Sequence, residues 1–143
     1  MKQLKWKTLG MLLLACAHAA ASVDTSAPPG GVYRLKPGTY VAKGSDCGAP
    51  ANAAILAYDG KGLSGAHSRA CQATVRSRTA SGNVRRYVVD QSCIDAGAGP
   101  AARSTQRQQV AVRDALHFTQ TIKGRATSYG YCADYQLPES LRK

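Results

Sequence analysis

Three residues with the side chains of a serine hydrolase lie within one glycine-rich segment. Asp59, Ser64 and His67 would supply an acid, a hydroxyl and an imidazole. A working triad also needs the serine on a strained turn, a base within reach and an oxyanion hole. No GxSxG sequence surrounds Ser64, and His117, the other histidine after the leader, alternates with apolar neighbours and so points to solvent. We therefore predict that this segment forms a glycine-rich turn and not a catalytic site. A small periplasmic hydrolase that uses these three residues is kept as the alternative function.

Alternating polar and apolar residues predict a hairpin over residues 70–93. In both arms, inward-facing residues occupy every second position, which is typical of strands with one buried and one exposed face. Matching the two buried faces sets Val75 opposite Val89. Residues 81–83, with the sequence Ser-Gly-Asn, are then left as a three-residue loop in which glycine or asparagine can adopt a positive φ.

The cysteines after the leader predict two disulfides. Four remain there, an even number, which suits an oxidising compartment. The hairpin register places Cys71 opposite Cys93, within disulfide reach after a small local adjustment. Cys47 and Cys132 then pair by elimination. No CxxC motif or nearby histidine pair accompanies them, so we predict no metal site, and no motif indicates a cofactor.

The same register gathers arginine on the exposed face of the hairpin. Arg78 lies opposite Arg86, and Arg76 lies two residues along the same face. Like charges directly across a strand pair destabilise it, so we expect an offset from solvent, from nearby Asp90 or from a bound anion. Guanidinium groups bind phosphate and carboxylate well. The patch is a candidate anion-binding site, and the alternative is that the three arginines extend into water at little cost.

Tyrosines alternate in the last expected strand. Tyr129, Tyr131 and Tyr135 share one face, and Cys132 lies on the other. If the tyrosine face points inward, these residues belong to the core. If it points outward, Tyr129 and Tyr131 join the arginines in a recognition surface. A disulfide cysteine usually faces inward, which favours the outward tyrosines, and both orientations stay open.

Short segments rich in β-branched and aromatic residues run from Val32 onward, separated by Gly, Asn, Asp and Pro. No segment keeps a convincing helical period over ten or more residues. We therefore predict an all-β fold, a small antiparallel barrel or sandwich of about 7–9 short strands stabilised by disulfides. The expected strands cover residues 32–35, 38–43, 53–58, 70–79, 85–93, 107–113, 116–123 and 126–135.

Residues 1–21 are predicted to be a bacterial-type signal peptide. Lysines precede a short apolar run, and small residues after it offer cleavage sites. Cleavage would release a periplasmic or secreted protein, whereas acylation of Cys16 would make it an outer-membrane lipoprotein. Downstream, we expect a flexible lead-in over 22–31, one β domain over 32–137 and a C-terminal tail over 138–143.

The charge balance indicates an anionic partner. The leader carries three of the 19 Lys and Arg residues and none of the 8 acids, so 16 cations and 8 acids remain. Export and the lack of a recognition motif argue against nucleic acid. We predict a non-enzymatic exported binding protein of the bacterial envelope, of an inhibitor, immunity or accessory type. We expect its partner to be an acidic protein or an anionic polymer. Membrane contact is expected only if Cys16 is acylated. The oligomeric state is left open.

Overall fold

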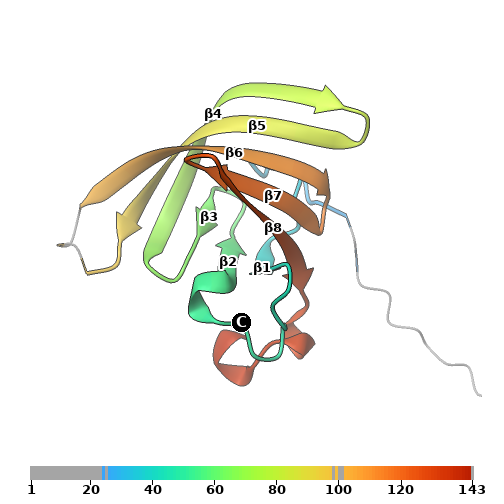
Figure 1. The fold of residues 1–143 in the computed structure, drawn as a ribbon, viewed down its shortest axis with the longest axis vertical. Helices are drawn as coiled ribbons and strands as arrows, with labels where there is room; N and C mark the ends of the chain where they lie inside the picture. Colours follow the sequence, from blue (N-terminus) through green and yellow to red (C-terminus); the bar gives the residue numbers. More distant parts are fainter. Residues whose placement is uncertain (1–23, 25, 98, 100–101, 143) are drawn as a thin grey trace, which may run out of the picture.

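The computed structural model describes residues 24, 26–97, 99 and 102–142 of the 143-residue chain. In this part of the chain, eight strands and three short 3₁₀ helices make up the regular structure (Figure 1), which confirms the all-β prediction. The predicted signal peptide, with Cys16, lies outside the described residues. None of the described helices has the length and apolar character needed to cross a membrane. The strands are β1 (Gly38–Ala42), β2 (Ile55–Tyr58), β3 (Leu63–Ser64), β4 (Ser68–Ser81), β5 (Val84–Asp95), β6 (Arg103–Asp114), β7 (His117–Ile122) and β8 (Arg125–Cys132), and the helices are η1 (Asn52–Ala54), η2 (Asp134–Gln136) and η3 (Glu139–Leu141).

All eight strands form one antiparallel sheet in the order β3-β2-β1-β8-β7-β6-β5-β4. The two ends of this order approach each other. The Ala73 N–H donates to the Lys61 carbonyl at 2.8 Å, and the Gln91 side chain bonds both backbone groups of Leu63, at 2.8 and 2.9 Å. The sheet therefore curls into a nearly closed barrel, which decides between the two architectures that the sequence left open.

Tyrosines fill much of the barrel interior. Tyr33, Tyr40 and Tyr58 are at most 1% exposed. Two of them satisfy their buried hydroxyls with backbone partners: Tyr40 donates to the Lys36 carbonyl at 2.6 Å, and Tyr58 donates to the Tyr33 carbonyl at 3.0 Å. Burial raises the pKa of both Tyr33 and Tyr40. The core thus keeps these phenols neutral and inside the barrel.

Two short elements differ from the prediction. Residues 32–35 were expected to be a strand, but they form a loop that inserts Tyr33 and Leu35 into the core. The two-residue strand β3 was not predicted. It is too short to show a periodic pattern, and its position depends on the contact with Gln91.

The β4–β5 hairpin follows the predicted register over half its length. Val75 pairs with Val89 as expected. A bulge between Val75 and Ser77 then shifts the pairing by one residue, so Ser81 pairs with Val84 and the loop contains two residues instead of three. Beyond this bulge, the prediction that Arg78 lies opposite Arg86 is wrong.

Both predicted disulfides are confirmed: Cys71 bonds Cys93, and Cys47 bonds Cys132. Two disulfides are typical of an oxidising, extracellular or periplasmic environment. The second bond lies outside the barrel, where Cys132 packs in a small separate cluster with buried Val41 and Leu137. It joins the loop after β1 to the end of β8, which are neighbouring strands of the sheet.

Candidate anion-binding face

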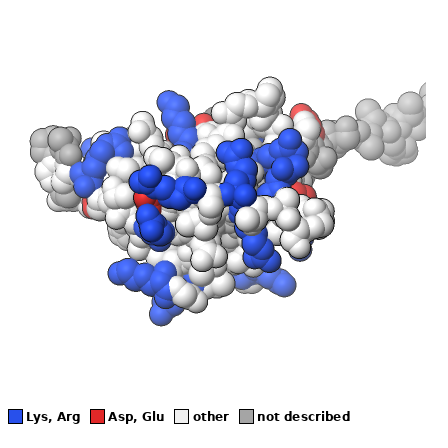
Figure 2. Space-filling view, turned by 90° about the horizontal axis from the view of Figure 1, so that it is seen from above, with Lys and Arg blue, Asp and Glu red and all other residues white. Residues whose placement is uncertain are grey.

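Arginine is concentrated on three neighbouring strands. Eight of the eleven arginines in the chain lie on β4, β5 and β6, all of which the structure describes, and these strands carry three aspartates and no glutamate. Figure 2 views the molecule from the side on which Figure 1 places β4 and β5, and blue side chains outnumber red ones there. The eight are Arg69, Arg76, Arg78, Arg85, Arg86, Arg103, Arg107 and Arg113.

The strand pairing places several of these arginines on the outer surface of the barrel. Tyr87 and Val89 of β5 are buried, so the residues between and beside them face outward. Arg86 is one of these, and the cross-strand partners of this outward face on β6 include Arg103 and Arg107. We call four residues of this surface the arginine stripe: Arg76, Arg86, Arg103 and Arg107.

Asp90 lies at the centre of the arginine stripe. Its carboxylate accepts from Arg76 Nε at 2.7 Å and from Arg107 Nε at 2.8 Å. The hydrogen bonds from Arg107 and Arg76 lower the pKa of Asp90 to about 2. Both arginine side chains stay more than half exposed, at 57% and 68%. One carboxylate therefore holds two guanidinium groups in place and leaves a net positive charge at the surface.

This arrangement makes stability depend on pH in the acid range. The pKa of Asp90 is about 2 in the folded chain, against an ordinary value of 3.8. The stabilisation from its ionised form is complete above about pH 4 and is lost as the pH falls towards 2. We expect Asp90→Asn to lower the urea midpoint at pH 7 and to flatten its fall between pH 4 and 2. The exposed Asp134→Asn is the control, and an unchanged acid profile in Asp90→Asn would refute the prediction.

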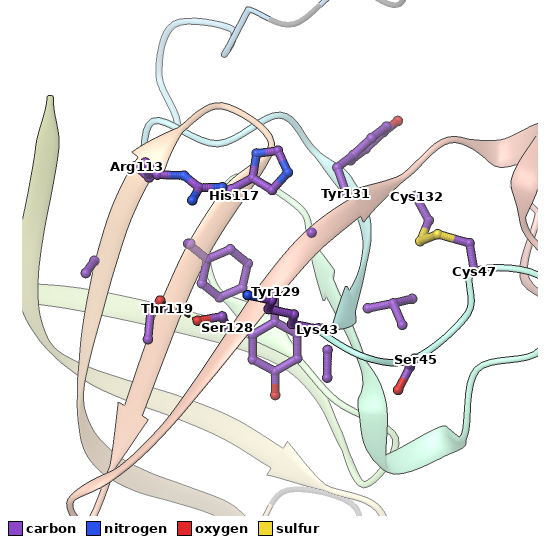
Figure 3. A pocket seen from close by; sticks show the side chains of 15 residues that line it. Lys43, Ser45, Cys47, Arg113, His117, Thr119, Ser128, Tyr129, Tyr131 and Cys132 are labelled. Atoms are coloured by element: carbon purple, nitrogen blue, oxygen red, sulfur yellow. Dashed lines mark hydrogen bonds between the residues drawn. A yellow bond between two sulfur atoms is a disulfide. The ribbon is translucent and has the colours of Figure 1, made fainter.

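A cleft of about 430 Å³ adjoins the arginine-bearing strands on the same outer surface (Figure 3). Its lining comes from β6, β7, β8, β1 and the loop after β1. Small residues, among them Ala111 and Gly130, are part of this lining. We call it the outer cleft, and its polar side chains are Lys43, Ser45, Arg113, His117, Thr119 and Ser128.

His117 is held by the tight turn between β6 and β7. Its Nδ1 lies 2.8 and 3.0 Å from the two carboxylate oxygens of Asp114, which also accepts the Leu116 backbone N–H at 2.9 Å. Although partial burial acts to raise the pKa of Asp114, these hydrogen bonds lower it overall. The ring lies over Gly130, where a Cβ atom would be 3.6 Å from His117 Cδ2. The imidazole orientation is therefore fixed at the edge of the outer cleft.

Hydrogen bonds also hold the part of the outer cleft that contains Thr119, Ser128 and Lys43. Thr119 Oγ1 and Ser128 Oγ lie 2.9 Å apart across the β7–β8 pair. The Lys43 backbone N–H donates to the Ser128 carbonyl at 2.8 Å, which keeps the lysine beside these hydroxyls. The Cys47–Cys132 disulfide contributes another part of the lining. Elements far apart in the sequence thus supply one set of polar groups.

The predicted site residues separate into two groups. Arg76 and Arg86 lie on the arginine stripe. Arg78 does not, because the bulge gives it Tyr87 as its partner, and its guanidinium carbon lies 5.4 Å from that ring centroid. Tyr129 is buried in the core. These residues therefore do not all lie on the arginine stripe, and Tyr129 and Tyr131 are among the residues that line the outer cleft.

The tyrosine face of the last strand points inward. Tyr131 packs on Tyr40 with ring centroids 5.5 Å apart. Lys36 Nζ lies 5.1 Å from the centroid of the Tyr131 ring. Cys132 faces outward into the smaller cluster, so the argument from its disulfide for outward tyrosines is wrong. Tyr135 lies beyond β8, in η2, and is 73% exposed.

The segment with the hydrolase residues has the geometry of a turn. Asp59 Oδ1 accepts the backbone N–H groups two and three residues along, at 2.9 and 3.1 Å. Gly62 lies so close to β4 that a Cβ atom on residue 62 would be 2.6 Å from the backbone oxygen of Cys71. Among the hydrogen bonds of the described residues, none joins the side chains of Asp59, Ser64 and His67. Most polar residues of the outer cleft were missed because they come together only through the long-range pairing of β1 with β8, although alternation within β6 and β7 places Arg113 and His117 on exposed positions. Comparisons with protein-family models, with curated proteins and with solved structures find no match for this chain.

Proposed function

We propose that the protein is an exported, non-enzymatic binding protein of the bacterial envelope, of an inhibitor, immunity or accessory type. Its basic outer surface would bind an acidic protein or an anionic polymer. The observation that carries the proposal is the arginine stripe, where Asp90 orders two guanidinium groups without removing them from solvent. Arginine donors in fixed positions suit carboxylate and phosphate groups.

The spacing along the arginine stripe suits a ligand that repeats its charge. Arg103 and Arg107 are four residues apart on β6, which is about 13 Å in an extended strand. Arg86 of β5 pairs with Ala111 of β6, and Ala111 lies four residues beyond Arg107. The cations therefore recur over roughly 27 Å of one surface. Such a row would attract a polyanion at long range and would make the encounter sensitive to salt.

The compartment belongs to the same proposal. The disulfides support an oxidising environment, and the predicted leader supports export to the periplasm or the medium. The intact mass of the mature chain tests this point, because cleavage after Ala21 gives a chain that begins at Ser22, whereas a lipoprotein begins at acylated Cys16. A mature chain that retains its leader in the cytoplasm would contradict export.

Reversing one charge on the arginine stripe tests the proposed binding. Arg86 is exposed on the outer surface, so Arg86→Glu should leave the fold intact. We expect about tenfold weaker binding to polyphosphate and to poly-L-glutamate at low salt, because a favourable contact becomes a repulsive one. Fluorescence anisotropy with labelled polymers measures the affinity.

Arg125→Glu is the matched control for this experiment. Arg125 is an exposed residue of β8, and alternation places it on the side of the strand that carries inward-facing Tyr129, not on the outer surface of the arginine stripe. Its reversal changes the net charge equally. It should retain most of the affinity. Equal losses in the two variants would show that net charge alone drives binding, and no binding by the unaltered protein would overturn the proposed function.

A further inference from the structure

The outer cleft presents hydrogen-bond donors and no carboxylate. Among the described residues that line it, Lys43 and Arg113 are cationic and none is acidic. Two carboxylates adjoin lining residues in the sequence, but neither is part of the lining. Asp114 is held by His117 and the Leu116 N–H, with Arg113 Nε at 3.6 Å, and Asp46 accepts the Gly48 N–H at 2.9 Å. The lining therefore favours a group that carries negative charge.

In its neutral form, the imidazole of His117 adds a hydrogen-bond acceptor to these donors. An ionised Asp114 can only accept, so the proton of the neutral ring lies on Nδ1, which faces that carboxylate at 2.8 Å. Nε2 is then left as an acceptor. The Thr119 and Ser128 hydroxyls can both donate and accept. The outer cleft thus combines cations with groups that recognise neutral hydroxyls.

The size of the outer cleft limits what it can hold. Its volume of about 430 Å³ lies at the lower end of small-molecule sites, enough for one sugar ring and too small for a folded partner. Figure 3 shows Arg113 and His117 on one side of the cavity and Lys43 with Ser45 on another. A ligand with an oxyanion and several hydroxyls on one ring would satisfy both kinds of group.

We propose that the outer cleft binds one acidic sugar unit, a uronic acid or a sugar phosphate, of an anionic glycan. This inference rests on the proposed function and chooses the anionic polymer over the acidic protein. The oxyanion would accept from Arg113 and Lys43, and ring hydroxyls would bond His117 Nε2 and the Ser128 hydroxyl. The arginine stripe would then bind further acidic units of the same glycan.

Nuclear magnetic resonance titration of the mature, disulfide-bonded chain tests this proposal. The probes are glucuronate and glucose 6-phosphate, compared with glucose, inorganic phosphate and a short poly-glutamate peptide. We expect the two acidic sugars to shift the backbone signals of Ser128 and Gly130 and the ring signals of His117. Glucose and inorganic phosphate should bind at least about tenfold more weakly, because each lacks one of the two recognised features.

Two kinds of variant separate charge from shape. Arg113→Gln removes a cation, and we expect about tenfold weaker binding of glucuronate. Gly130→Ala leaves every charge in place and fills the lining, since its Cβ would meet only His117 at ordinary contact distance, so the chain should fold and lose affinity. Arg125→Gln, away from the outer cleft, is the control and should bind as the unaltered chain does.

Four results would overturn the inference. Equal shifts with inorganic phosphate would show a site for any anion, and stronger shifts with poly-glutamate would favour an acidic protein. Shifts confined to the arginine stripe would remove the outer cleft from the binding site but leave the proposed function standing. A failure of every anionic probe at both surfaces would reject the proposed function as well.

Discussion

Replacing Cys47 and Cys132 together with alanine is expected to lower the free energy of unfolding by about 4.5 kcal/mol. The disulfide closes a loop with a sequence separation of 85 residues, so its loss returns a large conformational freedom to the unfolded chain. It also removes buried sulfur from the cluster with Val41 and Leu137. Urea unfolding, monitored by circular dichroism, measures the change.

The other disulfide provides the comparison. Cys71 and Cys93 are 22 residues apart, so the same chain-entropy argument gives a loss of about 3.4 kcal/mol for the double alanine variant. We therefore expect the variant that lacks Cys47–Cys132 to be the less stable of the two. The reverse order would show that local packing, and not loop closure, sets the contribution of these bonds.

Gln91→Met is expected to destabilise the barrel by about 2–5 kcal/mol. Gln91 accepts the Leu63 N–H at 2.8 Å and donates to the Leu63 carbonyl at 2.9 Å, and both residues are buried. Methionine has a similar length but replaces neither bond, so two backbone groups would be buried without partners. Because these bonds join β5 to β3, the variant should also speed hydrogen exchange at the Leu63 amide.

Gln106→Met is the matched control for this substitution. Gln106 pairs with Gln91 across the β5–β6 ladder, but its side chain is exposed. Its replacement should change stability by no more than about 0.5 kcal/mol. Equal effects at the two positions would contradict the role of Gln91 in closing the barrel.

The sequence predicted the hairpin well where alternation is regular and failed where it is not. The register around Val75 and Val89 and the Cys71–Cys93 bond both follow from residues of period two. A bulge adds one residue to a strand, and the amino-acid composition of this strand does not indicate where it occurs. From Arg76 to the end of β4 every residue is exposed, so no buried position there reports the shift.

The candidate site was harder to predict because it depends on long-range pairing. Asp90 was identified as a neighbour of the hairpin arginines, but Arg107 reaches it from β6, outside the hairpin. The outer cleft needs Lys43 beside Ser128, a contact that exists only because β1 pairs with β8. The inward tyrosines could not be chosen from alternation alone, since both faces of β8 carry residues suited to burial.

The salt dependence of polyanion binding tests the proposed function most directly. The affinity of the mature chain for a labelled anionic glycan, such as polygalacturonate, would be measured between about 50 and 200 mM salt. We predict a linear fall of log affinity with log salt, and a slope that is smaller by about one in Arg86→Glu and unchanged in Arg125→Glu. Binding that does not respond to salt, or a slope that both variants reduce equally, would contradict a specific role for the arginine stripe.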